Sequence, residues 1–299
     1  MKAVTFKNRT IDMAGHLHLP ADFNENVKYP AIVTVHPGGG VKEQTSGVYA
    51  RMFAEQGFVA LAFDASYQGE SGGEPRFLDD PMTRVADVYA AVDYLTTLPF
   101  VDADRIGALG ICAGGGLTVK AASIDRRIKA VATASAVNVG SLLRKGWDGK
   151  QPVETLIATL NAVAGQRTAE AAGAEPLLVP YVPCVGDTNA PQDLQEAAVY
   201  YLTPRGQHAN AQNKMLMNGL GGWAAFDAFD LVDILLTQPL MVVAGSAAGS
   251  LWHSEELYAK APGKKEMFLV ESARHMDLYD GEGATTAMGK FAPFFKANL

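Results

Sequence analysis

A cysteine flanked by glycines is the part of this sequence in which reactive chemistry is most evident. The string from Gly110 to Gly114 has Cys112 at its centre, follows the apolar run 105–109 and precedes a helical pattern of small residues. Glycines two places before and two places after a nucleophile let a strand and a helix approach closely around a strained turn. The pattern also fits an ordinary helix start with a buried cysteine. Cys112 is therefore a candidate nucleophile that the rest of the chain must support.

The expected position of Cys112 at the start of a helix bears on its reactivity. A free thiol has a pKa of about 8.5, and the unpaired amides and positive dipole at a helix start lower that pKa. We therefore expect Cys112 to be partly ionised at neutral pH and able to attack a carbonyl carbon.

A second glycine-rich stretch, residues 36–40, follows the apolar run 30–35. Its glycines leave backbone amides free to approach a ligand. The amide of Gly38 or Gly39, together with that of Ala113, would supply the two donors that hold a tetrahedral oxyanion. The alternative is a simple glycine-rich turn.

His275 is the candidate general base. It follows the last apolar strand pattern, residues 266–270, and the base comes after the nucleophile in chain order in sites of this kind. An ordinary loop histidine is the alternative interpretation.

A carboxylate that would orient His275 is missing from its expected place. The loop 245–252 contains none, and the nearest acids are Glu255, Glu256 and Glu271. Each of these is also typical of a solvated surface charge. A Cys–His pair can work without a third member, since a thiol needs less help from the base than a hydroxyl does.

The elements that must position these residues alternate regularly. Two short β patterns open the chain, and continuous apolar runs alternate with helical patterns after them, which indicates a parallel sheet buried on both faces by helices. The expected strands are 3–6, 14–19, 30–35, 58–63, 105–109, 130–135, 239–244 and 266–270, and the expected core helices are 49–56, 82–95, 113–123, 254–260 and 284–296.

The alternation stops between residues 138 and 235. This stretch contains helical patterns at about 152–171, 191–202 and 224–235. We predict a core made of residues 1–137 and 236–299, with 138–235 inserted as a lid over the carboxyl ends of the strands. Its candidate pocket-lining residues are Trp147, Leu156, Leu160, Tyr181, Tyr200, Tyr201, Trp223, Phe226 and Phe229.

Composition excludes several other classes of function. Apolar residues make up 48% of the 299 residues, the net charge is −7, and no basic cluster or apolar run long enough to span a bilayer is present. We expect a cytoplasmic protein that binds a small acyl substrate but neither nucleic acid nor membrane, and a homodimer stays open. No metal-ligand spacing or phosphate-binding lysine predicts a cofactor. Cys184 is expected to be a buried structural thiol.

Several strings together resemble the α/β-hydrolase superfamily, and within it the lidded, dienelactone-hydrolase-like group with a cysteine nucleophile. They are the G-x-C-x-G-G string that contains Cys112 and the segments 36–44, 63–73, 201–206 and 275–280. The resemblance covers nearly the whole chain. It implies the α/β-hydrolase fold, a mostly parallel sheet flanked by helices, with a helical lid.

The chain departs from that group in one respect. The group usually carries an aspartate about where Gly249 stands, so the resemblance implies that the standard acid has been lost. Dienelactone hydrolases hold their resting thiol against a glutamate, and Glu43 is a candidate for that part; a surface glutamate is the alternative.

Three functions follow as hypotheses. The first is an esterase, lactonase or thioesterase that works through an acyl-Cys112 intermediate. The second is an acyltransferase or intramolecular cyclase that uses the same intermediate with a different acceptor. The third is a non-hydrolytic protein that keeps the fold to bind a ligand, which the missing acid favours.

Overall fold

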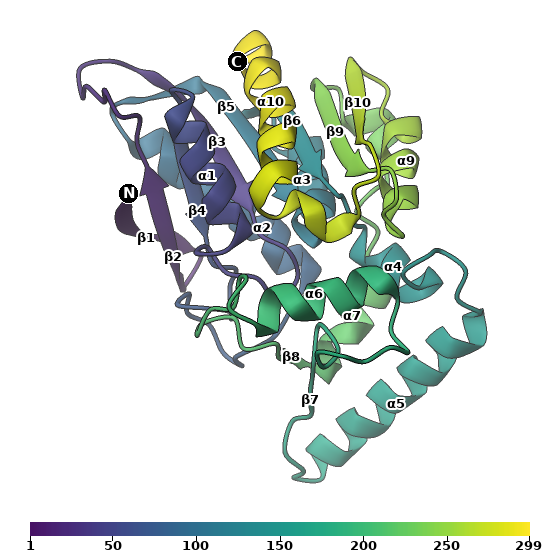
Figure 1. Ribbon diagram of the computed structural model, residues 1–299. Coiled ribbons are helices and arrows are strands. Elements are labelled where there is room, and N and C mark those ends of the chain that lie inside the picture. Colours follow the sequence, from purple (N-terminus) through teal and green to yellow (C-terminus); the bar gives the residue numbers. More distant parts are fainter.

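The computed structural model describes all residues from 1 to 299 and is built on an eight-stranded sheet. The strand order is β1-β2-β4-β3-β5-β6-β9-β10, and every pair from β4 to β10 is parallel. The strands are β1 (Lys2–Asn8), β2 (Ile11–His18), β3 (Tyr29–Val35), β4 (Val59–Phe63), β5 (Val101–Ile111), β6 (Ile128–Ala134), β9 (Leu240–Gly245) and β10 (Lys265–Val270). The predicted fold class is confirmed, as Figure 1 shows.

Burial of the strands follows their apolar patterns. All residues of β4 and β9 are buried, as expected of parallel strands covered on both faces. In contrast, β1 and β2 pair antiparallel at one edge, and buried residues alternate with partly exposed ones along β2. The edge strands therefore tolerate polar residues that the centre of the sheet does not.

Two apolar layers sandwich the sheet. One contains residues of α2 (Pro81–Thr97), α3 (Ala113–Ile124) and α9 (Leu251–Lys260), and the other contains residues of α1 (Thr45–Glu55) and α10 (Gly281–Asn298). Neighbouring residues of one strand serve opposite layers: Val33 packs in the first and Ile32 in the second. This arrangement fixes the strand ends from which the candidate site is built.

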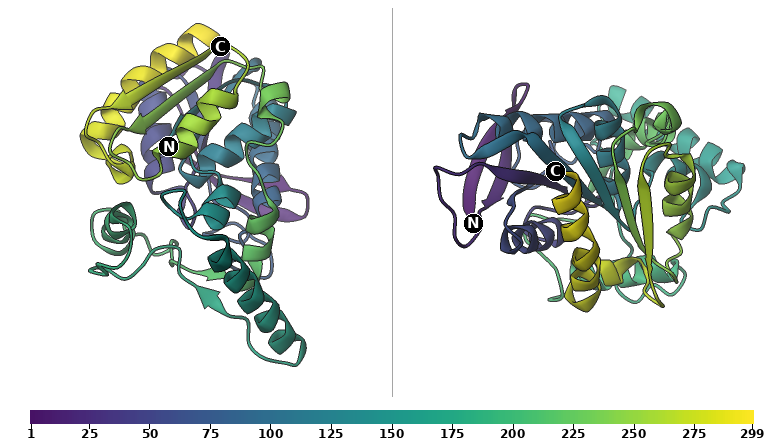
Figure 2. Two further views of the ribbon diagram at one scale, coloured as in Figure 1. Left: turned by 90° about the vertical axis from the view of Figure 1, so that its right-hand side faces the viewer. Right: turned by 90° about the horizontal axis from the view of Figure 1, so that it is seen from above.

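Residues 138–235, called the insertion below, extend beyond one end of the sheet. Figures 1 and 2 show their helices below the core, with α5 projecting farthest. The elements are α4 (Val139–Lys145), α5 (Val153–Ala171), β7 (Leu178–Val179), α6 (Gln192–Leu202), β8 (Met215–Leu216), the 3-10 turn η1 (Met217–Gly219), α7 (Leu220–Ala225) and α8 (Val232–Leu235). The predicted helices 152–171 and 191–202 correspond to α5 and α6.

The single helix predicted for 224–235 is wrong. The chain forms α7 and α8 with a turn between them. The Asp227 carboxylate accepts hydrogen bonds from the Phe229 amide (2.9 Å) and the Asn138 side chain (2.6 Å), which holds the turn, and Leu231 adopts a positive φ of 62°. A short acidic side chain that bonds nearby backbone amides competes with a continuous helix. No helix of the structure is both long and apolar enough to cross a bilayer.

Candidate active site

Cys112 occupies a strained turn between β5 and α3. Its backbone has φ 54° and ψ −122°, a conformation that L-residues rarely adopt. Its carbonyl oxygen accepts hydrogen bonds from the amides of Gly115 (2.8 Å) and Val137 (2.9 Å). The turn is therefore held by backbone groups on both of its sides.

The two flanking glycines make this turn possible. A Cβ atom at Gly110 would lie 2.2 Å from the carbonyl oxygen of Gly114, and a Cβ atom at Gly114 would lie 2.3 Å from that of Val35. Both distances are far below any real carbon–oxygen contact, so strand and helix meet closely only because neither residue has a side chain.

The sulfur of Cys112 faces two backbone amides and one hydroxyl. They are the backbone amides of Ala113 and Gly38 and the hydroxyl of Tyr279. Burial raises the pKa of the Cys112 thiol, while these groups and the positive charge of Arg84 lower it without cancelling the effect of burial. The expected partial ionisation at neutral pH is therefore wrong: apolar surroundings outweigh the helix start, and the resting group is a thiol.

The structure distinguishes between the two predicted oxyanion glycines. The amide of Gly38 faces the sulfur, as that of Ala113 does. Gly39 has a φ of 68° and lies beneath the ring of Tyr181, so that a Cβ atom there would be 2.5 Å from a ring carbon. Gly39 thus gives the insertion a place to pack, while Gly38 supplies the donor.

Charged residues behind the glycine-rich loop hold it in place. The Arg84 guanidinium donates to the carbonyl oxygen of His36 (2.8 Å) and lies 3.7 Å from the Asp79 carboxylate. Asp79 in turn accepts a hydrogen bond from the hydroxyl of Tyr181 (2.7 Å). The same carboxylate therefore links the loop of the core to the insertion.

His275, in the 3-10 turn η2 (His275–Leu278), lines the same cavity as Cys112. Its Nδ1 atom is 2.6 Å from Oγ of Ser250, and its Nε2 atom is 3.3 Å from the hydroxyl of Tyr279. The ring packs edge-on against Trp147, with 5.0 Å between centroids. Burial lowers the pKa of His275 to about 4, opposed by the negative charge of Asp193. The imidazole is neutral at neutral pH, as a proton acceptor must be.

The hydroxyl of Tyr279 links His275 to Cys112, and the sequence analysis did not predict it. It makes hydrogen bonds both to the sulfur of Cys112 and to Nε2 of His275. Its place four residues after His275, which puts both side chains on one face of a helical turn, is the signal that would have pointed to it.

Neither predicted carboxylate contacts its expected partner, which is the Cys112 thiol for Glu43 and His275 for Glu255. Glu43 pairs with Lys42 at 2.7 Å and lies 3.8 Å from His208. Glu255 is exposed on α9. The structure therefore places Glu43 in an ion cluster beside the glycine-rich loop and Glu255 at the surface.

A carboxylate that the sequence did not reveal lies close to His275. Asp193 belongs to the first turn of α6 in the insertion and is buried. Its Oδ2 atom accepts hydrogen bonds from the amide of Gly249 (2.7 Å) and the indole of Trp147 (2.8 Å), while its Oδ1 atom is buried without a partner. No motif marks this aspartate, because it is far from the expected loop in sequence.

A cavity of about 430 Å³ opens on these side chains. Cys112, His275 and Tyr279 line it from the core, and 17 of its 25 lining residues are hydrophobic. The aromatic residues predicted for it that do line it are Trp147, Tyr181, Tyr201 and Trp223. The predicted candidates Leu156, Leu160, Tyr200, Phe226 and Phe229 are not among its lining residues.

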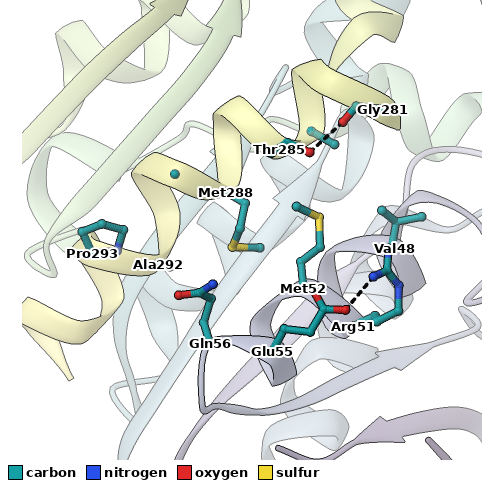
Figure 3. Close-up of a pocket in the computed structure, with 12 residues that line it drawn as sticks. Val48, Arg51, Met52, Glu55, Gln56, Gly281, Thr285, Met288, Ala292 and Pro293 are labelled. Atoms are coloured by element: carbon teal, nitrogen blue, oxygen red, sulfur yellow. Dashed lines mark hydrogen bonds and ion pairs between the residues drawn. The ribbon is translucent and has the colours of Figure 1, made fainter. Parts of the chain in front are cut away.

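A second hollow, of about 690 Å³, lies between α1 and α10, away from these residues. Figure 3 shows Met52 and Met288 pointing into it, and the ion pair of Arg51 with Glu55 (2.6 Å) at its side. It contains no nucleophile and no histidine. The residues suited to chemistry are therefore gathered in the smaller cavity. Cys184, expected to be buried, is exposed and lines neither.

Comparison with known proteins agrees with this geometry. The model of the dienelactone hydrolase family matches residues 15–172. The chain is 46% identical to the uncharacterized protein YcjY of Escherichia coli (strain K12), over 98% of this chain and 96% of that one. The crystal structure of the hypothetical protein PA2218 from Pseudomonas aeruginosa has a TM-score of 0.93 at 36% identity and covers 100% of this chain and 93% of its own.

A more distant relative is the polyketide transferase grgF from a Penicillium species. It is 25% identical over 87% of this chain and 85% of its own length. The crystal structure of the alpha/beta hydrolase GrgF from Penicillium has a TM-score of 0.78 at 21% identity and covers 100% of this chain and 98% of that one, a likeness of fold. The chain therefore belongs to the dienelactone hydrolase family and is a hydrolase-type enzyme with the α/β-hydrolase fold.

Proposed function

We propose that this protein cleaves ester, lactone or thioester bonds through a covalent acyl-Cys112 intermediate. One observation carries the proposal: Cys112, whose sulfur faces two backbone amides, and the neutral ring of His275 line one largely apolar cavity and are linked by the hydroxyl of Tyr279. A nucleophile, oxyanion donors and a base within reach of one reacting carbon are what acyl transfer requires.

The first half of the reaction forms the acyl-enzyme. As the sulfur attacks the carbonyl carbon, the thiol proton passes to the Tyr279 hydroxyl, which gives its own proton to Nε2 of His275. The amides of Ala113 and Gly38 hold the negative oxygen of the tetrahedral intermediate. When the bond to the leaving group breaks, His275 returns the proton to the departing oxygen or sulfur.

The second half releases the acid. Water attacks the thioester carbon and gives a proton to His275, and the same two amides hold the second oxyanion. The carbon–sulfur bond then breaks, the sulfur recovers the proton, and the product leaves as a carboxylic acid. Because Cys112 rests as a thiol, the neutral base is needed in each half.

The insertion acts as a lid that selects the acyl group. Tyr181, Trp147 and Trp223 of the insertion line the cavity beside the core residues. An apolar enclosure favours acyl chains or aromatic acids of moderate size and limits the access of water.

Acyl transfer to a bound alcohol or amine is the second candidate. The cavity is mostly apolar, which restricts water, and relatives of this chain include proteins named polyketide transferases. Product analysis by mass spectrometry, with and without acceptor alcohols, separates the two reactions: transfer gives new esters in place of the free acid.

The test of the proposal compares Cys112→Ala with Cys184→Ala on a panel of p-nitrophenyl esters. We expect the first variant to lose at least about 10³-fold in kcat, and the second to match the wild type, since Cys184 is the exposed cysteine outside the cavity. Intact-mass analysis of the wild type after brief mixing should show one added acyl group. Undiminished turnover by Cys112→Ala would refute the intermediate.

A ligand-binding role without catalysis predicts a different outcome. Slow alkylation of Cys112 by iodoacetamide at neutral pH would not distinguish this role from catalysis. Burial raises the pKa of the thiol, so a slow reaction is expected in both cases. The decisive result would be the absence of acylation and turnover across the whole panel, together with saturable binding of acyl compounds.

A further inference from the structure

We propose that Asp193, supplied by the insertion, is the carboxylate that orients His275, and that it acts through the hydroxyl of Ser250. The inference rests on the proposed function, in which His275 is the base. It makes Asp193 and Ser250 positioning residues and assigns part of the catalytic machinery to the segment that covers the cavity.

The hydrogen bond of His275 to Ser250 depends on which ring nitrogen carries the hydrogen. For Nε2 to accept a proton, the hydrogen of the neutral ring must be on Nδ1. Nδ1 then donates to Oγ of Ser250 at 2.6 Å. Ser250 is buried, and its hydroxyl has no other hydrogen-bond partner in the structure, so its own hydrogen needs an acceptor.

One carboxylate oxygen of Asp193 has no hydrogen-bond partner. Its Oδ2 atom is fixed by the amide of Gly249, the residue that immediately precedes Ser250. Its Oδ1 atom is buried without any partner. A buried carboxylate oxygen is costly to leave unpaired. Ser250, which follows Gly249, also has a hydroxyl hydrogen without an acceptor. The structure contains no hydrogen bond between the two side chains, and we infer that one forms when His275 acts as the base.

The absence of a side chain at Gly249 leaves space for the Asp193 carboxylate. A Cβ atom at Gly249 would lie 3.1 Å from Oδ2 of Asp193 and 3.1 Å from the ring of Trp147. A larger residue at 249 would therefore push against both. The aspartate expected at position 249 is absent, and the carboxylate of Asp193 contacts that same position from α6. Asp193 therefore takes the place of the missing acid.

The charge of Asp193 also acts on His275. The groups that face His275 are Asp193 from α6, His253 from α9 and Tyr279 from the turn after η2, and Tyr279 links it to Cys112. Burial lowers the pKa of His253 to about 3, so it is neutral. Asp193 is the carboxylate whose charge raises the pKa of His275 and would stabilise the imidazolium formed during the reaction.

The experiment compares Asp193→Asn, Ser250→Ala and the double variant. Asn keeps the shape of Asp and an oxygen for the amide of Gly249, but it removes the charge. We expect kcat to fall by about 10- to 100-fold with little change in KM, and the acid limb of kcat/KM to move to lower pH. The double variant should lose no more than the larger single loss, because both residues act in one chain.

Glu196→Gln is the matched control on the same helix. Glu196 is partly exposed and pairs with Arg274 at 3.6 Å, so this change also removes one negative charge from α6 near His275. We expect its kcat and pH profile to stay within about twofold of the wild type. An equal loss in both variants would attribute the effect to the general field of the helix and overturn the proposal.

Other outcomes separate this inference from the proposed function. Wild-type kcat and pH profile in Asp193→Asn, with Cys112→Ala inactive, would overturn the role of Asp193 alone. Should Asp193→Asn fail to fold, Ser250→Ala carries the test, since it leaves the contact of Asp193 with Gly249 intact, and full activity in it would refute the chain. Gly249→Asp should lose activity, and a gain would equally overturn the proposal.

A readout that needs no turnover is the tautomer of His275. Nitrogen chemical shifts of ¹⁵N-histidine-labelled protein at pH 7 should show the hydrogen on Nδ1 in the wild type. Asp193→Asn and Ser250→Ala should both increase the fraction with the hydrogen on Nε2, and Glu196→Gln should not. Unchanged shifts in all three variants would refute the orienting role of Asp193. This result does not depend on whether the protein has the proposed activity.

Discussion

The two halves of the site differ in how firmly the fold holds them. The core half, with Cys112, the amide donors and His275, lies at the ends of buried strands, and ten of the 12 residues of α3 are buried. The insertion half is supplied by less buried segments, and only Val163 of the 19 residues of α5 is buried. The groups proposed to form and break bonds are thus held by the sheet, while α5, at the outer side of the insertion, is little packed.

The largest effect is expected from the base of the core half. His275→Gln should lower kcat by at least about 10³-fold, because Nε2 is the atom that takes the proton in both halves of the reaction. Steady-state ester hydrolysis measures it. If the loss were no greater than that of Asp193→Asn, the division of labour between core and insertion would be wrong.

Glycine substitutions test the same division through stability. Gly110→Ala should reduce the free energy of unfolding by about 3 kcal/mol or more, since its Cβ would lie 2.2 Å from a backbone oxygen. Gly165→Ala, in α5, has no atom within 4 Å of the new Cβ and should stabilise by about 0.5–1 kcal/mol. Urea unfolding measures both, and equal losses would contradict the comparison.

Acid should weaken the core before the insertion. Burial lowers the pKa of His36 and His253 to about 3 and that of His275 to about 4, against 6.5 when unfolded. Their stabilisation is fully present above pH 6.5 and is lost as the pH falls toward these folded-state values, by about 2 kcal/mol each between pH 7 and 5. Asp87, whose pKa burial raises to about 6, acts in the opposite direction.

His253→Phe isolates one of these contributions. Both ring nitrogens of His253 are buried without partners, so a phenyl ring loses no hydrogen bond there. The variant should lose about 2 kcal/mol less than the wild type between pH 7 and 5, measured by urea unfolding at each pH. The same pH dependence in both proteins would refute a buried neutral His253.

The smallest effect is expected where the insertion meets the core. Tyr181→Phe removes the hydrogen bonds to Asp79 (2.7 Å) and Gln68 (3.2 Å) but keeps the ring over Gly39. KM for apolar esters should rise about three- to tenfold with kcat nearly unchanged. A fall in kcat with constant KM would place Tyr181 in the chemistry instead.

The sequence was most informative where neighbours in the chain are also neighbours in space. The continuous apolar runs predicted β3, β4 and β9, and the spacing of glycines around Cys112 predicted the turn that the structure contains. The same kind of reasoning placed His275 after the last strand. These features depend on residues that are close together in the chain, so local patterns are enough to predict them.

It was least informative where distant segments meet. Asp193 reaches the loop at Gly249 across 56 positions, and nothing in its own surroundings predicts that contact. The pKa of Cys112 is set by apolar walls from both halves, which the helix start alone did not reveal. Asp227 ended a helix whose apolar spacing continued past it.

The turn at Cys112 separates geometry from reactivity. Its close contacts are made by Gly110 and Gly114, and its carbonyl is held by backbone amides, so the side chain at 112 contributes nothing to the shape of the turn. Serine would meet the same backbone, the same two donors and the same base at no structural cost. Exchange of the attacking atom, sulfur for oxygen, is therefore open to this backbone in a single step, and the two atoms would differ in how much help they need from the base.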